Sequence, residues 1–291
     1  MQAVVDENFL QQLELFSMAV KDNVAGLFGG NHKSKKTGSS CEFADYRDYI
    51  EGDDITKIDW NIYGRTEKMY LKLFLDERQM QTRIYIDAST SMTYFKKDEM
   101  AVRLATALAW LSIKEMDRVS IYAIKGRHVE PILEKCIGKD AFMNAISTIN
   151  KITFGGEASI SEALTRSTVG YGDGRSIIIS DFLSNKEFLD IIDYLRGKKR
   201  DVLCLQILSP EELNPTIRGK NIIRDSEDDG RFYKDNIGRE ILAAYKQAVK
   251  YVTSRVENYC LAREADYLLV NTADSLKDVL LSTLVNKGVI S

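Results

Sequence analysis

Three side chains with oxygen ligands stand at alternate positions at the end of a short apolar run. The run covers residues 83–87, and its last residue, Asp87, is followed by Ser89 and Ser91. Alternate residues of an extended segment project to the same side, so the carboxylate and the two hydroxyls converge on one point. Hard oxygen ligands of this kind suit Mg²⁺ or Mn²⁺. The spacing therefore indicates a candidate cation site.

A second carboxylate follows another apolar run. Residues 176–180 read Ser-Ile-Ile-Ile-Ser, and Asp181 comes directly after them. If both runs are parallel strands, their carboxyl ends meet at the edge where open α/β sheets bind ligands. Asp181 would then join Asp87 at the cation site. The alternative is that Asp87 and the serines only cap the following turn and helix, where these residue types are common.

The same residues support an enzyme less well than a non-enzymatic cation site. A Mg²⁺-dependent phosphate-ester hydrolase could use Asp87 and Asp181, but Ser89 stands where such phosphatases carry a second acid. A glycine-rich turn for a dinucleotide is absent after the first run. A serine nucleophile needs a base, and the two histidines, His32 and His128, lie in no recognisable motif. A non-enzymatic site is the favoured interpretation.

The elements that must position these residues alternate between apolar runs and helical patterns. Strands are predicted at 83–87, 119–124, 176–180, 202–208 and 267–270, and helices at 97–115, 140–149, 159–168, 186–196, 242–259 and 276–285. This alternation predicts an α/β fold with a doubly wound, mostly parallel sheet flanked by helices. Residues 69–75 alternate between apolar and polar and are predicted as an antiparallel edge strand. A hairpin is predicted at 221–234, around Asp229-Gly230.

The first eighty residues are expected to be organised differently from the rest of the chain. An amphipathic helix is expected from Phe9 to Leu27, ending at Gly29-Gly30, and a polar loop follows. We expect residues 1–80 to form an appendage packed on a main domain of residues 81–291.

Composition excludes several partners. Forty Lys and Arg residues against 43 Asp and Glu residues give a net charge of −3, which offers no field for gathering nucleic acid. No apolar run is long enough to span a membrane. Asp6 and Glu7 occupy the place where a signal peptide would need positive charge. The four cysteines are scattered singly. These features predict a cytoplasmic protein.

Several motifs together resemble known families. Asp87-Ala-Ser-Thr-Ser91-Met looks like the metal-ion-dependent adhesion site of von Willebrand factor A domains, and Asp181 matches the later aspartate of that site. The stretch before it closely resembles the bacterial family called domain of unknown function 58. The resemblance to that family covers essentially the whole chain, and these blocks carry it: Gly30-x-His32-x-Ser34, Cys41-Glu42-Phe43, Arg47-Asp48-Tyr49, Gly52-Asp53-Asp54, Lys57-Ile58-Asp59-Trp60 and Glu77-Arg78.

The resemblance implies a protein-binding module. In an adhesion site, Ser89 and Ser91 would ligate the ion directly, Asp87 and Asp181 would hold it partly through water, and a partner's carboxylate would complete the octahedron. Members of the family are thought to work beside MoxR-type AAA+ ATPases in assembling or maturing a client protein complex. The family's threonine position falls on Glu157 or Ala158 here, so its hydroxyl is missing. Three alternatives follow: Glu157 ligates the ion itself, Ser159 replaces the threonine if the loop is shifted, or the protein is a metal-free scaffold.

The charged block before the first run has two interpretations. Its charged members could form ion pairs that pin the N-terminal segment to the sheet, with Trp60 as an apolar anchor. Alternatively, the block is a surface for docking a partner. The residues concerned are Glu42, Arg47, Asp53, Asp54, Asp59, Trp60 and Arg65.

Overall fold

The computed structural model describes residues 3–21, 42–49, 55, 58–75, 80–167, 174–183, 190–224 and 232–285. The chain divides into two compact units: one contains residues 1–28 and 80–291, and the other contains residues 29–79. The larger unit carries Asp87, Asp181 and the whole of the main sheet.

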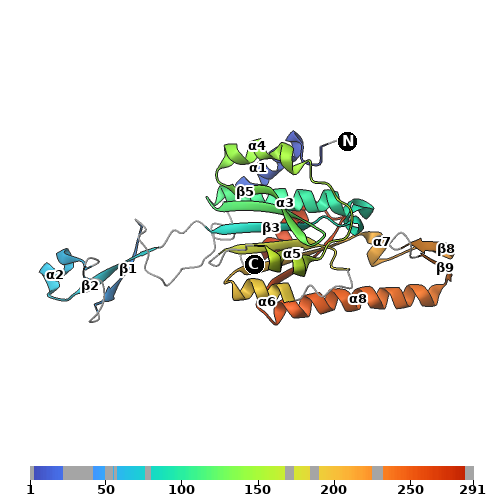
Figure 1. The fold of residues 1–291 in the computed structure, drawn as a ribbon. Helices are drawn as coiled ribbons and strands as arrows, with labels where there is room; N and C mark the ends of the chain where they lie inside the picture. Colours follow the sequence, from blue (N-terminus) through green and yellow to red (C-terminus); the bar gives the residue numbers. More distant parts are fainter. Residues whose placement is uncertain are drawn as a thin grey trace. The chain divides into compact units, whose positions relative to one another are not determined.

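The main sheet has six strands in the order β10-β7-β6-β3-β4-β5 (Figure 1). These strands are β3 (Gln81–Asp87), β4 (Arg118–Lys125), β5 (His128–Cys136), β6 (Arg175–Ser180), β7 (Asp201–Leu208) and β10 (Asp266–Asn271). All neighbouring pairs are parallel except β4 and β5. The predicted doubly wound, mostly parallel sheet with one antiparallel edge strand is confirmed.

The identity of that edge strand differs from the prediction. Residues 69–75 were expected at this edge, but β2 (Tyr70–Leu75) pairs instead with β1 (Glu42–Asp48) in a separate two-stranded sheet. The edge strand is β5, whose pairing with β4 is interrupted by register shifts around Ile121. Pro131 lies within β5, and a proline is tolerated there because an edge strand leaves some backbone N–H groups unpaired.

Helices cover both faces of the sheet, so its central strands are buried on both sides. Ile84 and Ile86 of β3 join the hydrophobic cluster on one face, whereas Tyr85 joins the cluster on the other. The first face is covered by α1 (Glu7–Lys21), α3 (Lys97–Lys114), α4 (Lys139–Ile149) and α9 (Leu276–Val285), and the second by α5 (Ile160–Arg166), α6 (Asp190–Gly197) and α8 (Arg239–Leu261).

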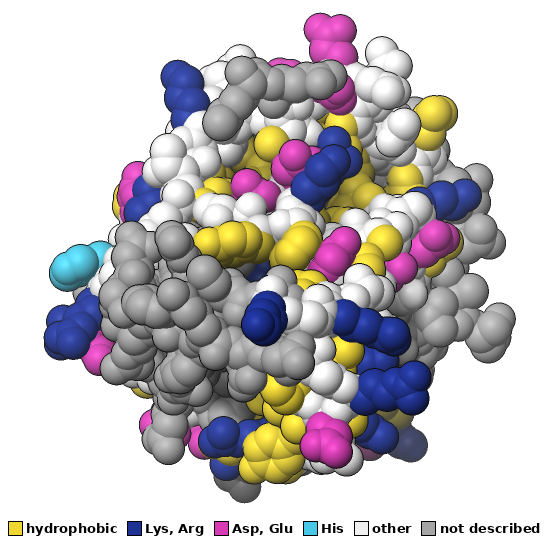
Figure 2. Space-filling view, turned by 90° about the vertical axis from the view of Figure 1, so that its right-hand side faces the viewer, with side chains coloured by type: hydrophobic (Ala, Val, Ile, Leu, Met, Phe, Trp, Pro, Cys, Tyr) yellow, Lys and Arg dark blue, Asp and Glu magenta, His cyan; other side chains and the backbone are white. Residues whose placement is uncertain are grey.

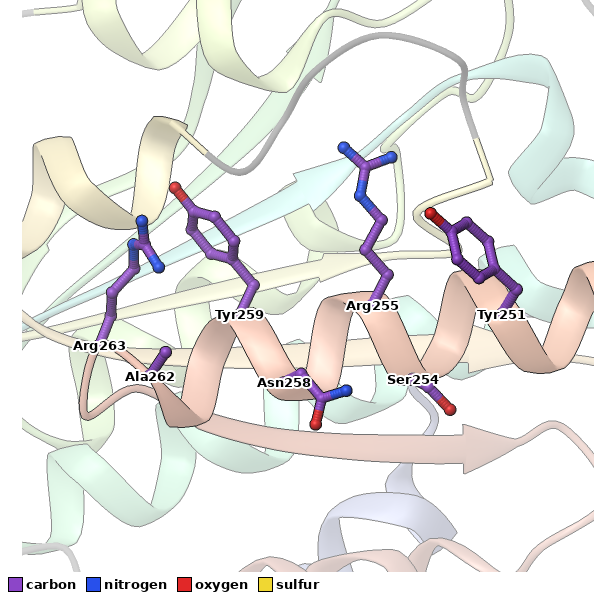
Figure 3. Close-up of a pocket in the computed structure, with 7 residues that line it drawn as sticks. All are labelled: Tyr251, Ser254, Arg255, Asn258, Tyr259, Ala262 and Arg263. Carbon is purple, nitrogen blue, oxygen red and sulfur yellow. The ribbon is translucent and has the colours of Figure 1, made fainter.

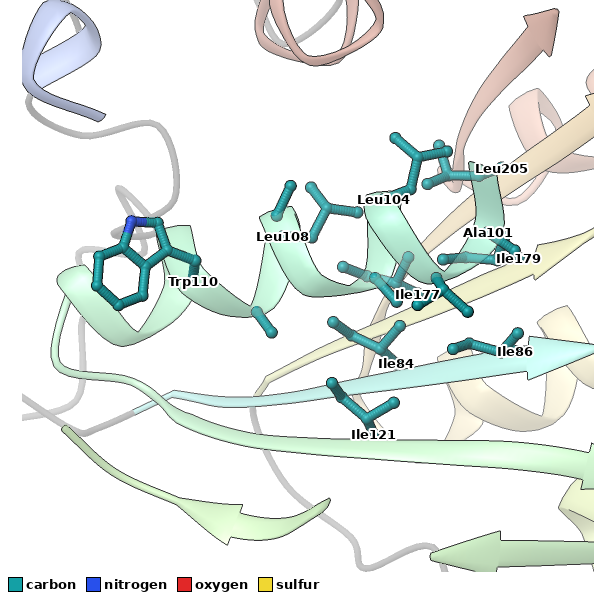
Figure 4. Close-up of a cluster of buried hydrophobic side chains, with 14 of the residues drawn as sticks. Ile84, Ile86, Ala101, Leu104, Leu108, Trp110, Ile121, Ile177, Ile179 and Leu205 are labelled. Atoms are coloured by element: carbon teal, nitrogen blue, oxygen red, sulfur yellow. The ribbon is translucent and has the colours of Figure 1, made fainter. Parts of the chain in front are cut away.

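Helix α3 is the centre of the first cluster. Its residues from Met100 to Ile113 are almost all buried, and Figure 4 shows Ala101, Leu104 and Leu108 against the isoleucines of β3 and β6. The helix begins at Lys97, directly after the short 3₁₀ segment η2 (Thr90–Lys96). A buried helix fixed in this way gives its first residue a defined position beside the sheet.

The smaller elements lie outside the main sheet. In the smaller unit, α2 (Trp60–Thr66) stands between β1 and β2 along the chain. In the larger unit, α7 (Pro210–Leu213) precedes an antiparallel pair formed by β8 (Gly219–Arg224) and β9 (Phe232–Ile237), where the hairpin was predicted. Its Asp-Gly turn and the predicted helical residues 22–27 lie outside the described residues. None of the described helices combines the length and apolar character that crossing a bilayer requires.

Candidate functional site

The candidate site lies where the order of the strands reverses. Strands β3 and β6 are neighbours, with Ile86 opposite Ile179. After β3 the chain continues to β4 on one side, and after β6 it continues to β7 on the other. The loops that follow the two strands therefore diverge, and open α/β sheets bind their ligands in the crevice that such loops leave. Asp87 ends β3 and Asp181 follows β6, so both predicted carboxylates lie at this edge.

Asp87 is buried, and each of its carboxylate oxygens accepts a hydrogen bond from a neutral donor. The backbone N–H of Ser89 donates to its Oδ1 at 3.0 Å, and the Ser180 hydroxyl donates to its Oδ2 at 2.6 Å. Burial, followed by the nearby charge of Asp181, raises the pKa of Asp87, while the hydrogen bonds from Ser180 and Ser89 oppose that rise. Sequence reasoning found Asp87 and Asp181 but missed Ser180, which links the ends of the two strands.

The two serines of the motif converge, although Ser91 lies in the 3₁₀ segment η2 and not in the extended chain that the prediction assumed. Their Oγ atoms lie 3.1 Å apart and share a hydrogen bond. Ser89 is buried, whereas Ser91 and Thr90 are half-buried at the start of η2. The hydroxyl pair therefore lies at the boundary between the core and the surface.

The loop that contains Glu157 lies directly beside the motif. The backbone N–H of Thr90 donates to the carbonyl of Gly156, and that of Gly155 donates to the carbonyl of Ala88, both at 2.8 Å. Gly155 and Gly156 have φ values of +153° and +75°, a region that favours glycine. Glu157 is exposed, and its carbonyl accepts a hydrogen bond from Gly126. The structure thus brings the loop to the site.

Lys97 is the functional candidate that sequence reasoning missed. Its side chain is 1% exposed, and its Nζ donates to Asp181 Oδ2 at 2.8 Å and to Glu212 Oε1 at 2.5 Å. Burial alone lowers the pKa of Lys97, but the charges of Asp181 and Glu212 outweigh burial, and the pKa is raised. The amine therefore stays charged inside the protein.

Both acceptors of Lys97 are held by the backbone. Glu212 forms a capping box with Ser209 at the start of α7, with bonds of 2.8 and 3.1 Å. Asp181 Oδ1 accepts from the Leu183 N–H at 3.1 Å, and its carbonyl accepts from the Gln206 side chain at 2.7 Å. The ammonium thus connects α3, the end of β6 and α7.

A divalent ion of the adhesion-site kind does not fit these residues well. Two hydroxyls and Asp87 converge, but Oδ2 of Asp181 already binds an ammonium. The threonine position is occupied by Glu157 or Ala158, and neither supplies a hydroxyl. In the part of the chain that the structure describes, no three His, Cys, Asp or Glu side chains group as metal ligands. The ligand roles of Asp87, Ser89, Ser91, Asp181 and Glu157 stay predictions.

The charged block of the smaller unit is described only in part. Asp59 is buried and caps α2, where its Oδ1 accepts from Asn61 N at 2.9 Å and Ile62 N at 3.3 Å. Trp60 is 59% exposed and packs edge-on against Tyr63. Arg65 is exposed in the last turn of α2. Asp53, Asp54 and the side chains of Glu42 and Arg47 lie outside the described residues, so both interpretations of the block stay predictions.

A hollow that was not expected from the sequence lies along α8 and the turn after it. It is a shallow, open hollow of about 390 Å³, lined by Tyr251, Ser254, Arg255, Asn258, Tyr259, Ala262 and Arg263 (Figure 3). The Arg263 guanidinium lies 3.4 Å from the centre of the Tyr259 ring, and both side chains bind Asp193 of α6. These contacts tie α8 to α6, which is a structural role.

The fold and the edge define an α/β protein with an Asp-x-Ser-x-Ser loop at the switch point of a doubly wound sheet. More narrowly, the chain belongs to the family described as "Protein of unknown function DUF58", whose model matches residues 45–255. The chain is 23% identical over 232 residues to uncharacterized proteins of Mycobacterium tuberculosis and Mycobacterium bovis. The alignment covers 76% of this chain and 72% of each relative.

Solved structures also align with the chain at low similarity. One is an aerotolerance-related membrane protein from Bacteroides fragilis, with 15% identity, a TM-score of 0.39, and coverage of 71% of this chain and 99% of that one. Another is the SpRpn10 VWA domain, with 13% identity, a TM-score of 0.35, and coverage of 72% and 95%.

Proposed function

We propose that this chain is a protein-interaction module that binds its partner at the carboxyl edge of the main sheet, around η2. The observation that carries the proposal is a pair of aromatic side chains on η2. Tyr94 is 47% exposed and Phe95 is 50% exposed, and both follow Ser91 within the same short segment. Exposed aromatic residues beside polar groups are typical of the centre of a protein interface.

The local backbone supports this role. Phe95 has a φ of +54°, a conformation that costs a bulky residue free energy unless its surroundings hold it. The buried helix α3 on one side and the hydrogen-bonded loop of Thr90 on the other hold the segment. Figure 2 shows acidic, basic and hydrophobic side chains intermixed on one face of the molecule, a composition that suits a protein partner better than a polyanion.

The family resemblance suggests the kind of partner. We propose a MoxR-type AAA+ ATPase, with a client complex that the two proteins help to assemble or mature. The adhesion-site motif adds a finer alternative, in which Mg²⁺ or Mn²⁺ bridges the serines to a carboxylate of the partner. The ion pair of Lys97 favours the form of the interaction that needs no metal.

The test is direct binding to a purified MoxR-type ATPase encoded by the same genome, measured by biolayer interferometry. The variant Tyr94→Ser/Phe95→Ser removes the two aromatics. Tyr251→Ser on α8 is the matched control, because Tyr251 is 68% exposed and lines the hollow along α8. We expect the double variant to weaken binding at least tenfold and the control to leave it unchanged.

Two results would contradict the proposal. Equal binding by the wild type and the double variant would show that the interface does not lie at η2. Turnover of a phosphate ester that disappears in Asp87→Ala would instead favour the hydrolase. Repeating the binding measurement with Mg²⁺ and with chelator separates the metal-bridged form from the metal-free form.

A further inference from the structure

We infer that the ammonium group of Lys97 is the resident cation of the site at the β3–β6 switch point, and that the site takes no divalent metal ion. The inference rests on the proposed function only in assigning partner binding to this edge of the sheet. The identity of the cation follows from the ion pairs alone. It concerns the charge that holds together the end of β6, α3 and α7.

Lys97 occupies an unfavourable position at the start of α3. Phe95 and Lys96 have φ values of +54° and +63°, so the chain turns sharply before α3 begins. A lysine at the start of a helix is unfavourable for the helix dipole, and burial of its side chain adds to that cost. A position that is unfavourable on both counts is retained only if specific partners compensate, and Asp181 and Glu212 supply two carboxylates at 2.8 and 2.5 Å.

Asp181 already has a positive partner within the chain. One ammonium faces two carboxylates, and the third carboxylate, Asp87, is satisfied by Ser180 and Ser89. Asp181 needs a positive partner because it is 2% exposed, and Lys97 provides one from within the chain. No further positive charge is required to hold Asp181.

The ion pair of Lys97 with Asp181 leaves few oxygen ligands for a metal ion. Mg²⁺ demands six oxygen ligands in near-ideal octahedral geometry. With Asp181 paired to Lys97, the described residues of the motif offer Asp87 and two hydroxyls that already bond to each other. A divalent ion bound there would also lie beside a fixed ammonium, and like charges repel strongly in a buried setting.

The experiment is a titration of the full chain with Mn²⁺, followed by electron paramagnetic resonance and by calorimetry. We expect no stoichiometric binding up to millimolar Mn²⁺, and the same melting temperature in Mg²⁺ and in chelator. Stoichiometric binding by the wild type that is abolished in both Asp87→Ala and Ser89→Ala would overturn the inference. Binding that survives in those variants lies elsewhere on the protein and leaves the inference standing.

A variant sharpens the test from the other direction. Lys97→Met keeps the length of the side chain but removes the charge, so Asp181 is left without its cation. We expect a lower melting temperature that Mn²⁺ partly restores, because the ion can now replace the ammonium. No response to Mn²⁺ in folded Lys97→Met would contradict the equivalence of the two cations, and if this variant does not fold, the wild-type titration still decides.

These outcomes are distinguishable from those of the proposed function. Wild-type Mn²⁺ binding combined with loss of the partner in Tyr94→Ser/Phe95→Ser would overturn the inference and keep the interaction. If the wild type does not bind Mn²⁺ and Tyr94→Ser/Phe95→Ser binds the partner as well as the wild type does, the inference is kept and the proposed interface at η2 is contradicted.

Discussion

The guanidinium of Arg200 donates a hydrogen bond to the carbonyl of Gln81 at 2.5 Å, across 119 positions of the chain. The same group donates to the carbonyl of Arg175 at 2.6 Å and to the Ser176 hydroxyl at 3.2 Å. Arg200 is 1% exposed, so the amino ends of β3 and β6 are joined by one buried side chain.

Gly174 makes the approach of Arg200 possible, and its replacement by alanine should destabilise the protein. A Cβ at residue 174 would lie 2.6 Å from Arg200 Nη1 and would also overlap the carbonyl of Gln81, and the φ of +144° is unfavourable for alanine. We expect a loss of about 3 kcal/mol in the free energy of unfolding, measured with urea. Gly197→Ala in α6 is the control: its Cβ meets nothing within 4 Å, so we expect no loss or a gain of up to about 1 kcal/mol. Equal losses in the two variants would contradict the close packing at Gly174.

The pair of Lys97 and Asp181 should be strongly coupled. Lys97→Met leaves Asp181 buried without a cation and should lower the free energy of unfolding by about 3–5 kcal/mol. Asp181→Asn should lower it by less, because Lys97 keeps its ion pair with Glu212. The double variant should cost less than the sum, because the charge left by one change is removed by the other. Urea unfolding of the wild type and three variants completes the cycle. Strict additivity would show that the two groups do not interact in solution.

The hydroxyl of Ser180 should be needed to bury Asp87. It donates to Asp87 Oδ2 at 2.6 Å and accepts from Phe182 N at 3.0 Å, so Ser180→Ala leaves a buried carboxylate oxygen without its donor. We expect a loss of about 1–3 kcal/mol in the free energy of unfolding. Thr165→Ala on α5 also removes a hydroxyl, but an exposed one, and should change stability by less than about 0.5 kcal/mol. A smaller effect for Ser180→Ala than for the control would count against the bond to Asp87.

Asp117 should make stability depend on pH. Burial, with the charge of Glu115, raises the pKa of Asp117 from 3.8 to about 7, against the lowering effects of the Met80 N–H and Arg175. The folded state therefore holds the proton more tightly than the unfolded state. The contribution of Asp117 to stability is greatest below about pH 4, falls as pH rises to about 7, and is constant above that.

Asp117→Asn isolates that contribution. The asparagine carbonyl can still accept from Met80 N, which lies 3.1 Å from Asp117 Oδ1. We expect the variant to equal the wild type near pH 4 and to be more stable near pH 8, with the gap opening between those values. Thermal unfolding across this range measures the gap. A gap of constant size at every pH would show that Asp117 does not titrate in the window.

Much of the site's frame could be predicted from local sequence. The runs before Asp87 and Asp181 are apolar enough to identify buried strands, and parallel strands bring their carboxyl ends to one edge. Ser89 and Ser91 converge as expected, but through the turn into the 3₁₀ segment η2 and not through an extended chain. These features depend on neighbours in the sequence or on the general geometry of sheets.

Other features leave no local signal. Lys97 binds Glu212 across 115 positions, and Arg200 follows Lys198 and Lys199 in a run that resembles a solvated surface. Burial of such side chains depends on acceptors that only the folded chain brings near. Strand β5 was missed because its irregular register and partial exposure give it neither a continuous apolar run nor strict alternation.

The hydrogen bonds around Thr90 also bear on the thermodynamics of recognition. Ala88, Thr90, Gly126 and the loop 155–159 exchange backbone hydrogen bonds of about 2.8 Å, so three connections of the chain form one network. Ordering a loose loop upon association costs conformational entropy. Because these loops already hold one another, the edge is a preorganised template, and a partner that binds there gives up little of its interaction energy to rigidify it.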